Sequence, residues 1–395
     1  MPLFLHSADW QIGKPYARIA DPDKRARLRQ ARLEAIERIG DQARRCDAAF
    51  LVVAGDLFDS PTPASSDVSA VCSAIGQLEI PVLVIPGNHD HGAPGSVWHT
   101  PFFAKECQRR AANLSVLLER RPLELAEAVI LPCPLLRRSD SSDPSGWLQQ
   151  LNWLELPPQK ARIVLAHGSI QGFGTAELDA DDDNPAAANN RLDLQAPWLA
   201  EVDYVALGDW HGLKVVHEKA WYAGTPEPDR FARSSEYRAG QVLKVQAERG
   251  KLPEVEVCDT GAIGWRELRF HCRDDGDLER LEQQLDGLLG SRVGQDLLLL
   301  ELSGNLSLAG QQQLEALLER LEAQLLRLKR RGHCRLSPGA EELAALAQRP
   351  GDPLIARVAE ELRQRLHTTS SDHDPEVIER ALRALHRSVN ELGSC

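Results

Sequence analysis

Short apolar runs alternate with polar, helix-like stretches through the first 225 residues. Arg25–Arg45 places Leu28, Ala31, Ala35, Ile36 and Ile39 on one face, which predicts an amphipathic helix. Strands that alternate with helices predict an α/β domain whose active loops lie at the strand ends. Trp221–Thr225 and Gly240–Val245 then predict antiparallel strands that continue a sheet. The runs that predict buried strands are Leu3–His6, Ala49–Ala54, Val82–Ile85, Ala128–Leu131, Ile163–Ala166 and Tyr204–Leu207.

The pattern changes after Gly261 and predicts a second, smaller α/β domain. Trp265–His271 and Leu297–Leu302 predict strands, Asp277–Leu289 predicts a helix, and Leu308–Arg330 predicts a Leu-rich amphipathic helix. From Pro338 the pattern is helical again, and a polar stretch over 368–375 precedes a last predicted helix over 376–392. We therefore expect three parts, with boundaries at 1–265, 266–337 and 338–395.

Composition narrows the class of protein. The chain is 43% hydrophobic and 26% charged, which excludes overall disorder. No apolar run approaches the ~20 residues that a membrane span needs, and the first residues lack the features of a signal peptide. The 8 Cys contain no CxxC pair, a pattern that fits reduced thiols. We expect a cytoplasmic protein that does not bind membranes.

The net charge of −12 argues against a protein that coats nucleic acid by bulk electrostatics. This net charge does not exclude an enzyme that binds a phosphodiester through metal ions at one site. Two local clusters are basic: the predicted helix over 25–45, and Arg327, Lys329, Arg330 and Arg331 at the end of a predicted helix. Solvated helix faces are the simpler interpretation of both clusters, and phosphate contact is the alternative.

Five short segments place residues of metal-ligand type directly after predicted strands. Capping of helices by Asp and Asn, or core packing of His, explains any one of these segments. It does not explain all of them together, because the ends of strands in one domain converge on a single rim. The segments are His6–Gln11, Gly55–Asp59, Gly87–Asp90, Ala166–Gly168 and Gly208–Gly212.

The order of these motifs resembles that of calcineurin-like metallophosphoesterases. His6–Trp10, Gly55–Asp59 and Tyr222–Thr225 resemble one branch of that superfamily, the SbcD-type DNA-repair exonuclease subunits. The motifs cover residues 1–265, and residues 266–335 resemble the family in layout only. The resemblance implies a metallophosphoesterase sandwich of mixed β-sheets flanked by helices. The resemblance also implies a small α/β capping domain. The sequence pattern predicts a helical C-terminal tail after that domain.

The resemblance also implies roles for individual residues. Asp56 bridges two divalent ions, and His89 contacts the scissile phosphate and assists the leaving oxygen, with Asp90 or a neighbour orienting it. Mixed carboxylate, imidazole and amide ligands suit Mn²⁺, with Fe²⁺ or Zn²⁺ as alternatives. The expected metal ligands are Asp9, Gln11, Asp56 and His211 for the first ion, and Asp56, Asn88, His167 and Asp209 for the second.

Two positions depart from the resembled family, which has His at both. Gln11 offers only a neutral amide oxygen, so we expect the first ion to be held loosely. Asp209 remains a competent ligand and favours a harder cation. The other expected ligands are present, which favours retained activity over a degraded site.

The function that the motifs predict is two-metal-dependent hydrolysis of DNA phosphodiesters. The resemblance alone implies an SMC-like coiled-coil ATPase of SbcC type as partner, and a homodimer; the chain itself has no P-loop. The alternatives are a metallophosphoesterase for small nucleotides or phosphoproteins, and a weakly active scaffold subunit. Trp10 and Trp210 flank the site and either stack a base or pack beneath the loops.

Overall fold

The computed structural model describes residues 1–170, 190–231, 237–336 and 353–367, together with 377–378, 380–382 and 384–385. The sequence pattern also predicts a polar loop over Asp179–Asn190; of this loop only Asn190 is among the described residues, and the polar stretch over 368–375 lies outside them. The chain divides into two units, Met1–Gly264 and Trp265–Cys395, and each is described by itself.

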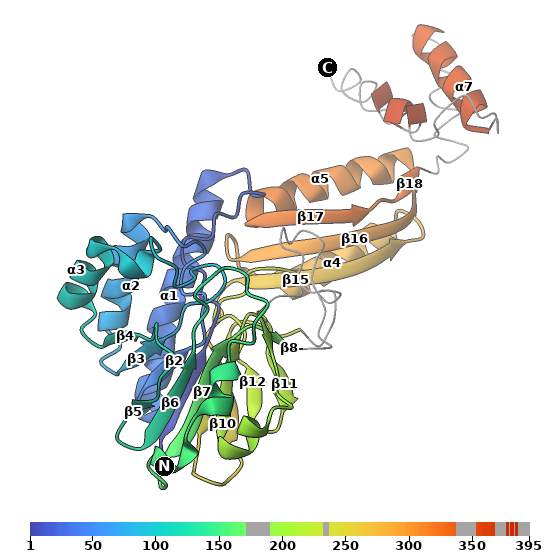
Figure 1. Cartoon of the computed structure of the whole chain (residues 1–395). Coiled ribbons are helices and arrows are strands. Elements are labelled where there is room, and N and C mark those ends of the chain that lie inside the picture. Colours follow the sequence, from blue (N-terminus) through green and yellow to red (C-terminus); the bar gives the residue numbers. More distant parts are fainter. Residues whose placement is uncertain are drawn as a thin grey trace. The chain divides into compact units, whose positions relative to one another are not determined.

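The first unit contains two six-stranded mixed sheets (Figure 1). In the first sheet the order is β14 (Glu254–Asp259), β13 (Gln241–Gln246), β1 (Leu3–Ser7), β2 (Leu51–Val53), β3 (Val82–Val84) and β4 (Leu114–Val116). In the second the order is β11 (Lys214–His217), β12 (Ala220–Tyr222), β10 (Tyr204–Gly208), β7 (Ala161–His167), β6 (Ala128–Cys133) and β5 (Leu123–Glu124). The prediction of a mixed α/β fold with mixed sheets is confirmed.

The two sheets pack face to face through alternate positions of their strands. Phe4 and Val52 point from the first sheet toward Ile163 and Tyr204 of the second. A buried polar link adds to this apolar layer, since His6 lies 2.9 Å (Nδ1) from the Tyr204 hydroxyl and 3.2 Å (Nε2) from the Leu207 carbonyl. Burial lowers the pKa of His6 to about 3, so this histidine is neutral and structural.

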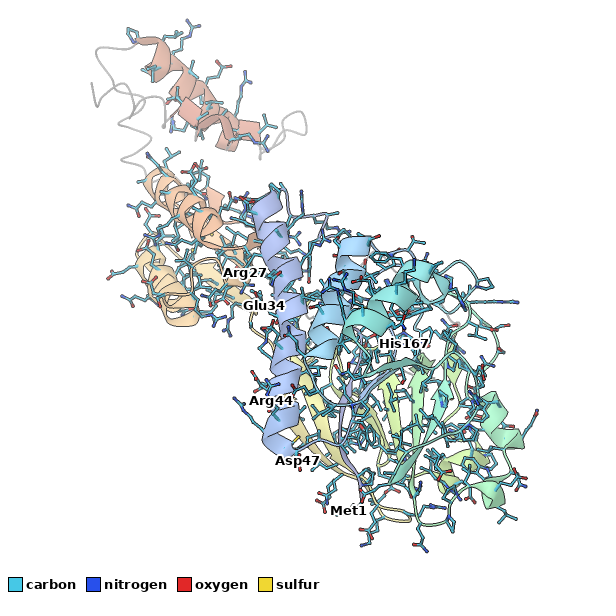
Figure 2. All side chains as sticks on the ribbon, turned by 90° about the vertical axis from the view of Figure 1, so that its left-hand side faces the viewer. Met1, Arg27, Glu34, Arg44, Asp47 and His167 are labelled. Carbon is cyan, nitrogen blue, oxygen red and sulfur yellow. The ribbon has the colours of Figure 1, made fainter. Side chains whose placement is uncertain are left out.

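Helices cover the other face of the first sheet. α1 (Pro22–Cys46) begins at Asp21, whose carboxylate accepts the amides of Asp23 and Lys24. Its predicted apolar face is buried against the alternate strand positions Leu5, Leu51 and Val53, as expected. Figure 2 shows α1 along its length, with the Arg27–Glu34 ion pair (3.0 Å) on its surface. α2 (Ser65–Gly76) and α3 (Pro101–Arg110) complete this layer.

None of the helices in the described part is long and apolar enough to cross a membrane. Short helical turns and strands form the connections between the main elements of this unit. The short elements are η1 (Val97–His99), η2 (Gly146–Gln150), η3 (Trp153–Glu155), η5 (Pro197–Glu201), β8 (Ser169–Ile170) and β9 (Arg191–Leu192).

One strand prediction in this unit is half correct. β13 is antiparallel to β1, with Leu3 opposite Gln246, as expected. β12 lies in the other sheet, where it runs antiparallel to β11, with Lys214 opposite Tyr222, and parallel to β10, with Leu207 opposite Tyr222. The error has a physical reason: a short buried strand shows its own periodicity but does not reveal its partner.

The second unit is a smaller α/β layer with a leucine core. Its sheet has the order β15-β16-β17, with β18 also paired to β16. Leu281, Leu300 and Leu318 pack between α4, α5 and the sheet. The elements are β15 (Gly264–Cys272), α4 (Asp277–Leu289), β16 (Asp296–Leu306), α5 (Leu308–Gln324), β17 (Arg327–Gly332), β18 (Arg335–Leu336) and α7 (Pro353–His367).

The predicted helix over Leu308–Arg330 is wrong in its last part. α5 ends at Gln324, and β17 then pairs in parallel with β16, with Leu297 opposite Arg327. Leucines continue through Leu325 and Leu326, which are buried, so the apolar pattern gives no sign of the change. The basic cluster Arg327–Arg331 therefore lies on a strand and not at the end of a helix.

Arg32 of α1 ties together two loops that follow the strands. Its side chain is buried, and its Nε and Nη2 donate to the carbonyls of Trp10 (2.7 Å) and Asp9 (2.9 Å). Its Nη1 and Nη2 also reach the Glu227 carbonyl (3.1 Å) and the Thr225 hydroxyl (3.0 Å). One guanidinium thus satisfies four buried acceptors and fixes the backbone that carries Asp9.

We predict that Arg32→Met lowers the free energy of unfolding by about 3–5 kcal/mol, because the buried carbonyls of Asp9 and Trp10 lose the donor that Arg32 provides. Arg29→Met on the same helix is the control, since Arg29 pairs with Asp67 at the surface (3.1 Å) and its loss costs below about 1 kcal/mol. Urea unfolding followed by circular dichroism measures both. Equal losses for the two variants would contradict the role of Arg32.

Candidate metal centre

The segments predicted to carry ligands follow parallel strands of the two sheets. Asp9 and Gln11 follow β1, Asp56 follows β2 and Asn88 follows β3. His167 is the last residue of β7 and lies opposite Gly208, the last residue of β10. The loop that carries Asp209 and His211 therefore starts next to His167. The carboxyl ends of the parallel strands meet at one edge, as the sequence predicts.

The backbone at this edge is strained. Among the described non-glycine residues eight have a positive φ, and four of these are expected ligands: Asp9 (55°), Gln11 (42°), Asp56 (55°) and Asp209 (104°). Such conformations cost about 1–3 kcal/mol each and persist where the surroundings hold them, typically at functional sites. Here the amide of Asp9 donates to the Gly55 carbonyl (3.1 Å), and that of Gln11 to the Asp56 carbonyl (2.8 Å).

Two glycines allow the loops to approach one another. Gly55 has φ +89°, and a Cβ there would lie 2.2 Å from Nδ1 of His167. Gly87 is required by space alone, because a Cβ there would lie 2.1 Å from Oδ1 of Asp56. The glycines beside Asp56 and Asn88 thus let side chains converge that any larger residue would hold apart.

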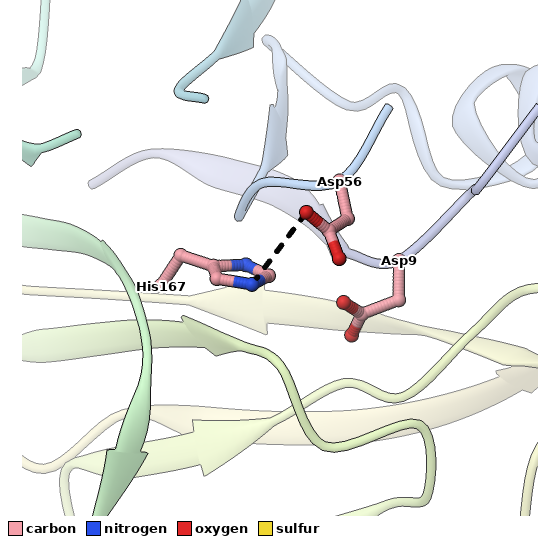
Figure 3. Close-up of side chains that lie close together, drawn as sticks. All are labelled: Asp9, Asp56 and His167. Atoms are coloured by element: carbon pink, nitrogen blue, oxygen red, sulfur yellow. Dashed lines mark ion pairs between the residues drawn. The ribbon is translucent and has the colours of Figure 1, made fainter. Parts of the chain in front are cut away.

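Asp9, Asp56 and His167 form a buried cluster whose ligand atoms all lie within 4.8 Å of one another (Figure 3). Nε2 of His167 lies 3.7 Å from Oδ1 of Asp56, 3.0 Å from Oδ1 of Asn88 and 3.7 Å from Oδ1 of Asp209. Nδ1 of His167 lies 2.7 Å from the Ala54 carbonyl, which assigns the proton to Nδ1. Nε2 therefore faces three oxygen atoms, and it would present its lone pair to a metal ion bound among them in place of its proton.

The charges of this cluster call for a cation. Burial raises the pKa of Asp9 to about 8, and the carboxylates of Asp56 and Asp209 add to this rise. Burial opposes the charge of His167, yet the carboxylates of Asp56, Asp9 and Asp209 outweigh it and raise the pKa to about 9. Crowded carboxylates with one imidazole and one amide oxygen are a donor set that fits a divalent metal ion.

Gln11 and His211, the other two expected ligands, hydrogen-bond to each other. Nε2 of Gln11 lies 3.3 Å from Nε2 of His211, and Lys14 donates to Oε1 of Gln11 (2.7 Å). Oε1 of Gln11, the atom with which this residue would ligate an ion, therefore already accepts from a protein cation. This donor set does not fit the first metal ion that the resemblance implies.

His89 lies on the rim of the cluster, where its amide donates to Oδ1 of Asp56 (2.9 Å). Its Nδ1 lies 3.1 Å from the carbonyl of Asp59 and 3.8 Å from the Asp59 carboxylate. Burial lowers the pKa of His89, but Asp56 and Asp59 outweigh it and the pKa is raised. The expected partner Asp90 is placed differently, since its oxygens accept the amides of Gly87 (2.7 Å) and Phe58 (3.0 Å).

Sequence reasoning missed several residues of this region. Lys14 and Asp229 form a partly buried ion pair (2.8 Å), and Arg230 adjoins His211 with 2.9 Å between Nη2 and Nδ1. These residues follow the motifs without belonging to them, so no spacing marks them. Trp10 is buried and donates to the Ser7 hydroxyl (2.8 Å), which assigns it to packing. Trp210 is half-buried, with Lys214 Nζ 5.3 Å from its ring centre.

Comparison with known proteins defines the class of the chain. The model of the calcineurin-like phosphoesterase family matches residues 2–239, which is more than half of the chain. The chain belongs to the calcineurin-like phosphoesterase family, and the buried cluster supports metal-dependent phosphoester hydrolysis. One solved crystal structure aligns with 66% of this chain and 100% of its own, at 12% identity and a TM-score of 0.39, too low to carry an argument.

We predict that Asp56→Asn abolishes metal binding and hydrolysis while the protein stays folded. Asn tolerates the positive φ of this position but supplies a neutral oxygen in place of the carboxylate. Asp47→Asn is the matched control, because Asp47 has a similar φ (53°) at the exposed end of α1. Metal content after dialysis against Mn²⁺ and thermal unfolding measure the two effects. Full metal content in Asp56→Asn would remove Asp56 from the ligand set.

Proposed function

We propose that this metal-dependent phosphoesterase hydrolyses phosphodiester bonds of DNA, as the nuclease subunit of an SbcCD-like repair or processing complex. The buried cluster of Asp9, Asp56 and His167 beside His89 carries the hydrolytic part of the proposal. The resemblance of His6–Trp10 and Gly55–Asp59 to the SbcD branch supports DNA as the substrate. The proposed metal is Mn²⁺, because the donor set mixes carboxylate, imidazole and amide ligands.

Asp9, Asp56, Asn88, His167 and Asp209 would hold the metal, which polarises a phosphate and activates a water when bound. His89 would move the proton. Its Nδ1 donates to the Asp59 carbonyl, so Nε2 is the atom that serves the leaving oxygen. Asp56 and Asp59 raise the pKa of His89 against the effect of burial, which favours the protonated form that a general acid requires.

The second unit and the basic strand β17 support a large anionic substrate over a small nucleotide or a phosphoprotein. β17 carries Arg327, Lys329, Arg330 and Arg331 within six residues, a density of charge suited to a phosphate backbone. An SbcC-type coiled-coil ATPase as partner and a homodimer are proposed with the function, on the resemblance alone.

The test is cleavage of labelled linear and circular DNA in Mn²⁺, beside a nucleoside cyclic phosphate and a phosphopeptide. We expect cleavage of DNA, its loss with chelator and in Asp56→Asn, and little turnover of the other substrates. Turnover of the small substrates with intact DNA would favour the small-molecule phosphoesterase. A protein that binds DNA, holds metal and cleaves nothing would favour the scaffold subunit.

We predict that His89→Ala slows hydrolysis roughly 10²–10⁴-fold while metal content is unchanged, because the imidazole serves proton transfer and not metal binding. His99→Ala is the control, since His99 lies on the same loop with Nε2 3.1 Å from the Gly92 carbonyl. Single-turnover rates and metal analysis separate the two effects. Loss of metal in His89→Ala would make His89 a ligand and overturn its assigned role.

A further inference from the structure

Four side chains beside the metal cluster close a hydrogen-bonded ring. Lys14 Nζ donates to Oε1 of Gln11 (2.7 Å), and Nε2 of Gln11 lies 3.3 Å from Nε2 of His211. Nδ1 of His211 lies 2.9 Å from Oδ2 of Asp229, and the same oxygen accepts from Lys14 Nζ (2.8 Å). The Lys14–Gln11 contact lies within one turn, and the other three contacts join residues from different loops, so the ring as a whole depends on the fold.

The partners assign every proton of the ring. Lys14 has only donors, so it fixes Oε1 of Gln11 toward itself and turns the amide N–H groups toward His211. Nε2 of His211 must then accept from Gln11, which places the imidazole proton on Nδ1, 2.9 Å from Oδ2 of Asp229. Nη2 of Arg230 lies beside the same Nδ1 (2.9 Å) and donates to Oδ2 of Asp229 (3.0 Å). Rotating the Gln11 amide would set two donors against each other at Lys14. The two atoms that a metal ion would require, Gln11 Oε1 and His211 Nε2, are both occupied.

The charge around the ring is already balanced by protein cations. Asp229 has a fully buried side chain and pairs with Lys14 at 2.8 Å and with Arg230 at 3.0 Å. Arg230 also adjoins the imidazole of His211, with Nη2 2.9 Å from Nδ1 and 3.5 Å from Nε2. Two positive side chains thus surround one carboxylate, and a further dication at this position would meet repulsion.

We propose that the chain binds one divalent ion, in the cluster of Asp9, Asp56 and His167, and that the Lys14–Gln11–His211–Asp229 ring with Arg230 replaces the second ion. The ammonium and guanidinium groups take the place of the positive charge that this ion would bring to His211 and Asp229. Lys14 is a positioning residue here, because it acts by fixing the Gln11 amide. The proposal rests on the metal-dependent site and does not require that the substrate is DNA.

The departure at Gln11 has a direct reason in this arrangement. An imidazole at position 11 would place a second basic ring near Lys14 and Arg230. The Gln11 amide instead accepts from Lys14 and donates to His211. The Gln and the Lys three residues later therefore form a matched pair. Substituting both residues, rather than Gln11 alone, should allow a second metal ion to bind.

The test counts Mn²⁺ ions by equilibrium dialysis with elemental analysis, which needs no substrate. We expect about one ion per chain in the unmodified protein and in Gln11→His. Gln11→His combined with Lys14→Met should gain a second ion, because it restores a ligand and removes the ammonium. Lys160→Met is the matched control: Lys160 pairs with Glu124 (2.7 Å) and its side chain is 23% exposed, against 20% for Lys14.

Two ions per chain in the unmodified protein would overturn the proposal, and so would a double variant that still binds one. Lys14→Arg, which keeps a cation donating to Gln11, should retain one ion and serves as the conservative variant. The count in the unmodified protein remains decisive if the double variant does not fold. Because the assay measures metal alone, a failure to cleave DNA leaves this count unaffected, and the two proposals fail separately.

Discussion

The site depends on one electrostatic constraint: the buried carboxylates of Asp9 and Asp56 are packed against each other around His167. Without a cation this arrangement is unfavourable, as the raised pKa of Asp9, about 8, shows. The fold provides the cations of Lys14 and Arg230 for Asp229, but only imidazoles, chiefly that of His167, for Asp9 and Asp56. The difference between these two neighbouring regions is the reason to place a metal ion in one and the Lys14 ring in the other.

Buried hydrogen bonds from residues around the cluster hold these carboxylates close together. Arg32 reaches through the core to the carbonyls of Asp9 and Trp10, and the Asp90 carboxylate joins the loops after β2 and β3 through the amides of Phe58 and Gly87. Such buried, satisfied polar contacts can maintain left-handed backbone at several ligand positions in succession. The contacts that hold these loops therefore lie on their buried side. His89 lies on the rim of the cluster, where it can reach a substrate.

Much of the fold and of the cluster was predictable because both follow strand ends and periodicity. The apolar face of α1 and the convergence of Asp56, Asn88 and His167 needed only the local pattern. What the sequence could not show depends on partners distant in the chain. Leu325 continues a helical stripe, yet pairing with β16 makes the next residues a strand, and Lys14 meets Asp229 only after folding. Spacing also could not show that Lys14 donates to the Gln11 amide.

The central claim is that the divalent ion lies among the oxygens facing His167. Anomalous diffraction at the manganese edge, on crystals of the unmodified protein grown with Mn²⁺, tests this directly because it locates the ion without any assay of activity. The account predicts one strong peak bordered by Nε2 of His167 and the carboxylate of Asp56, with Lys14 still bonded to Gln11. A peak of comparable height between Gln11 and His211, or the absence of a peak beside His167, would contradict it.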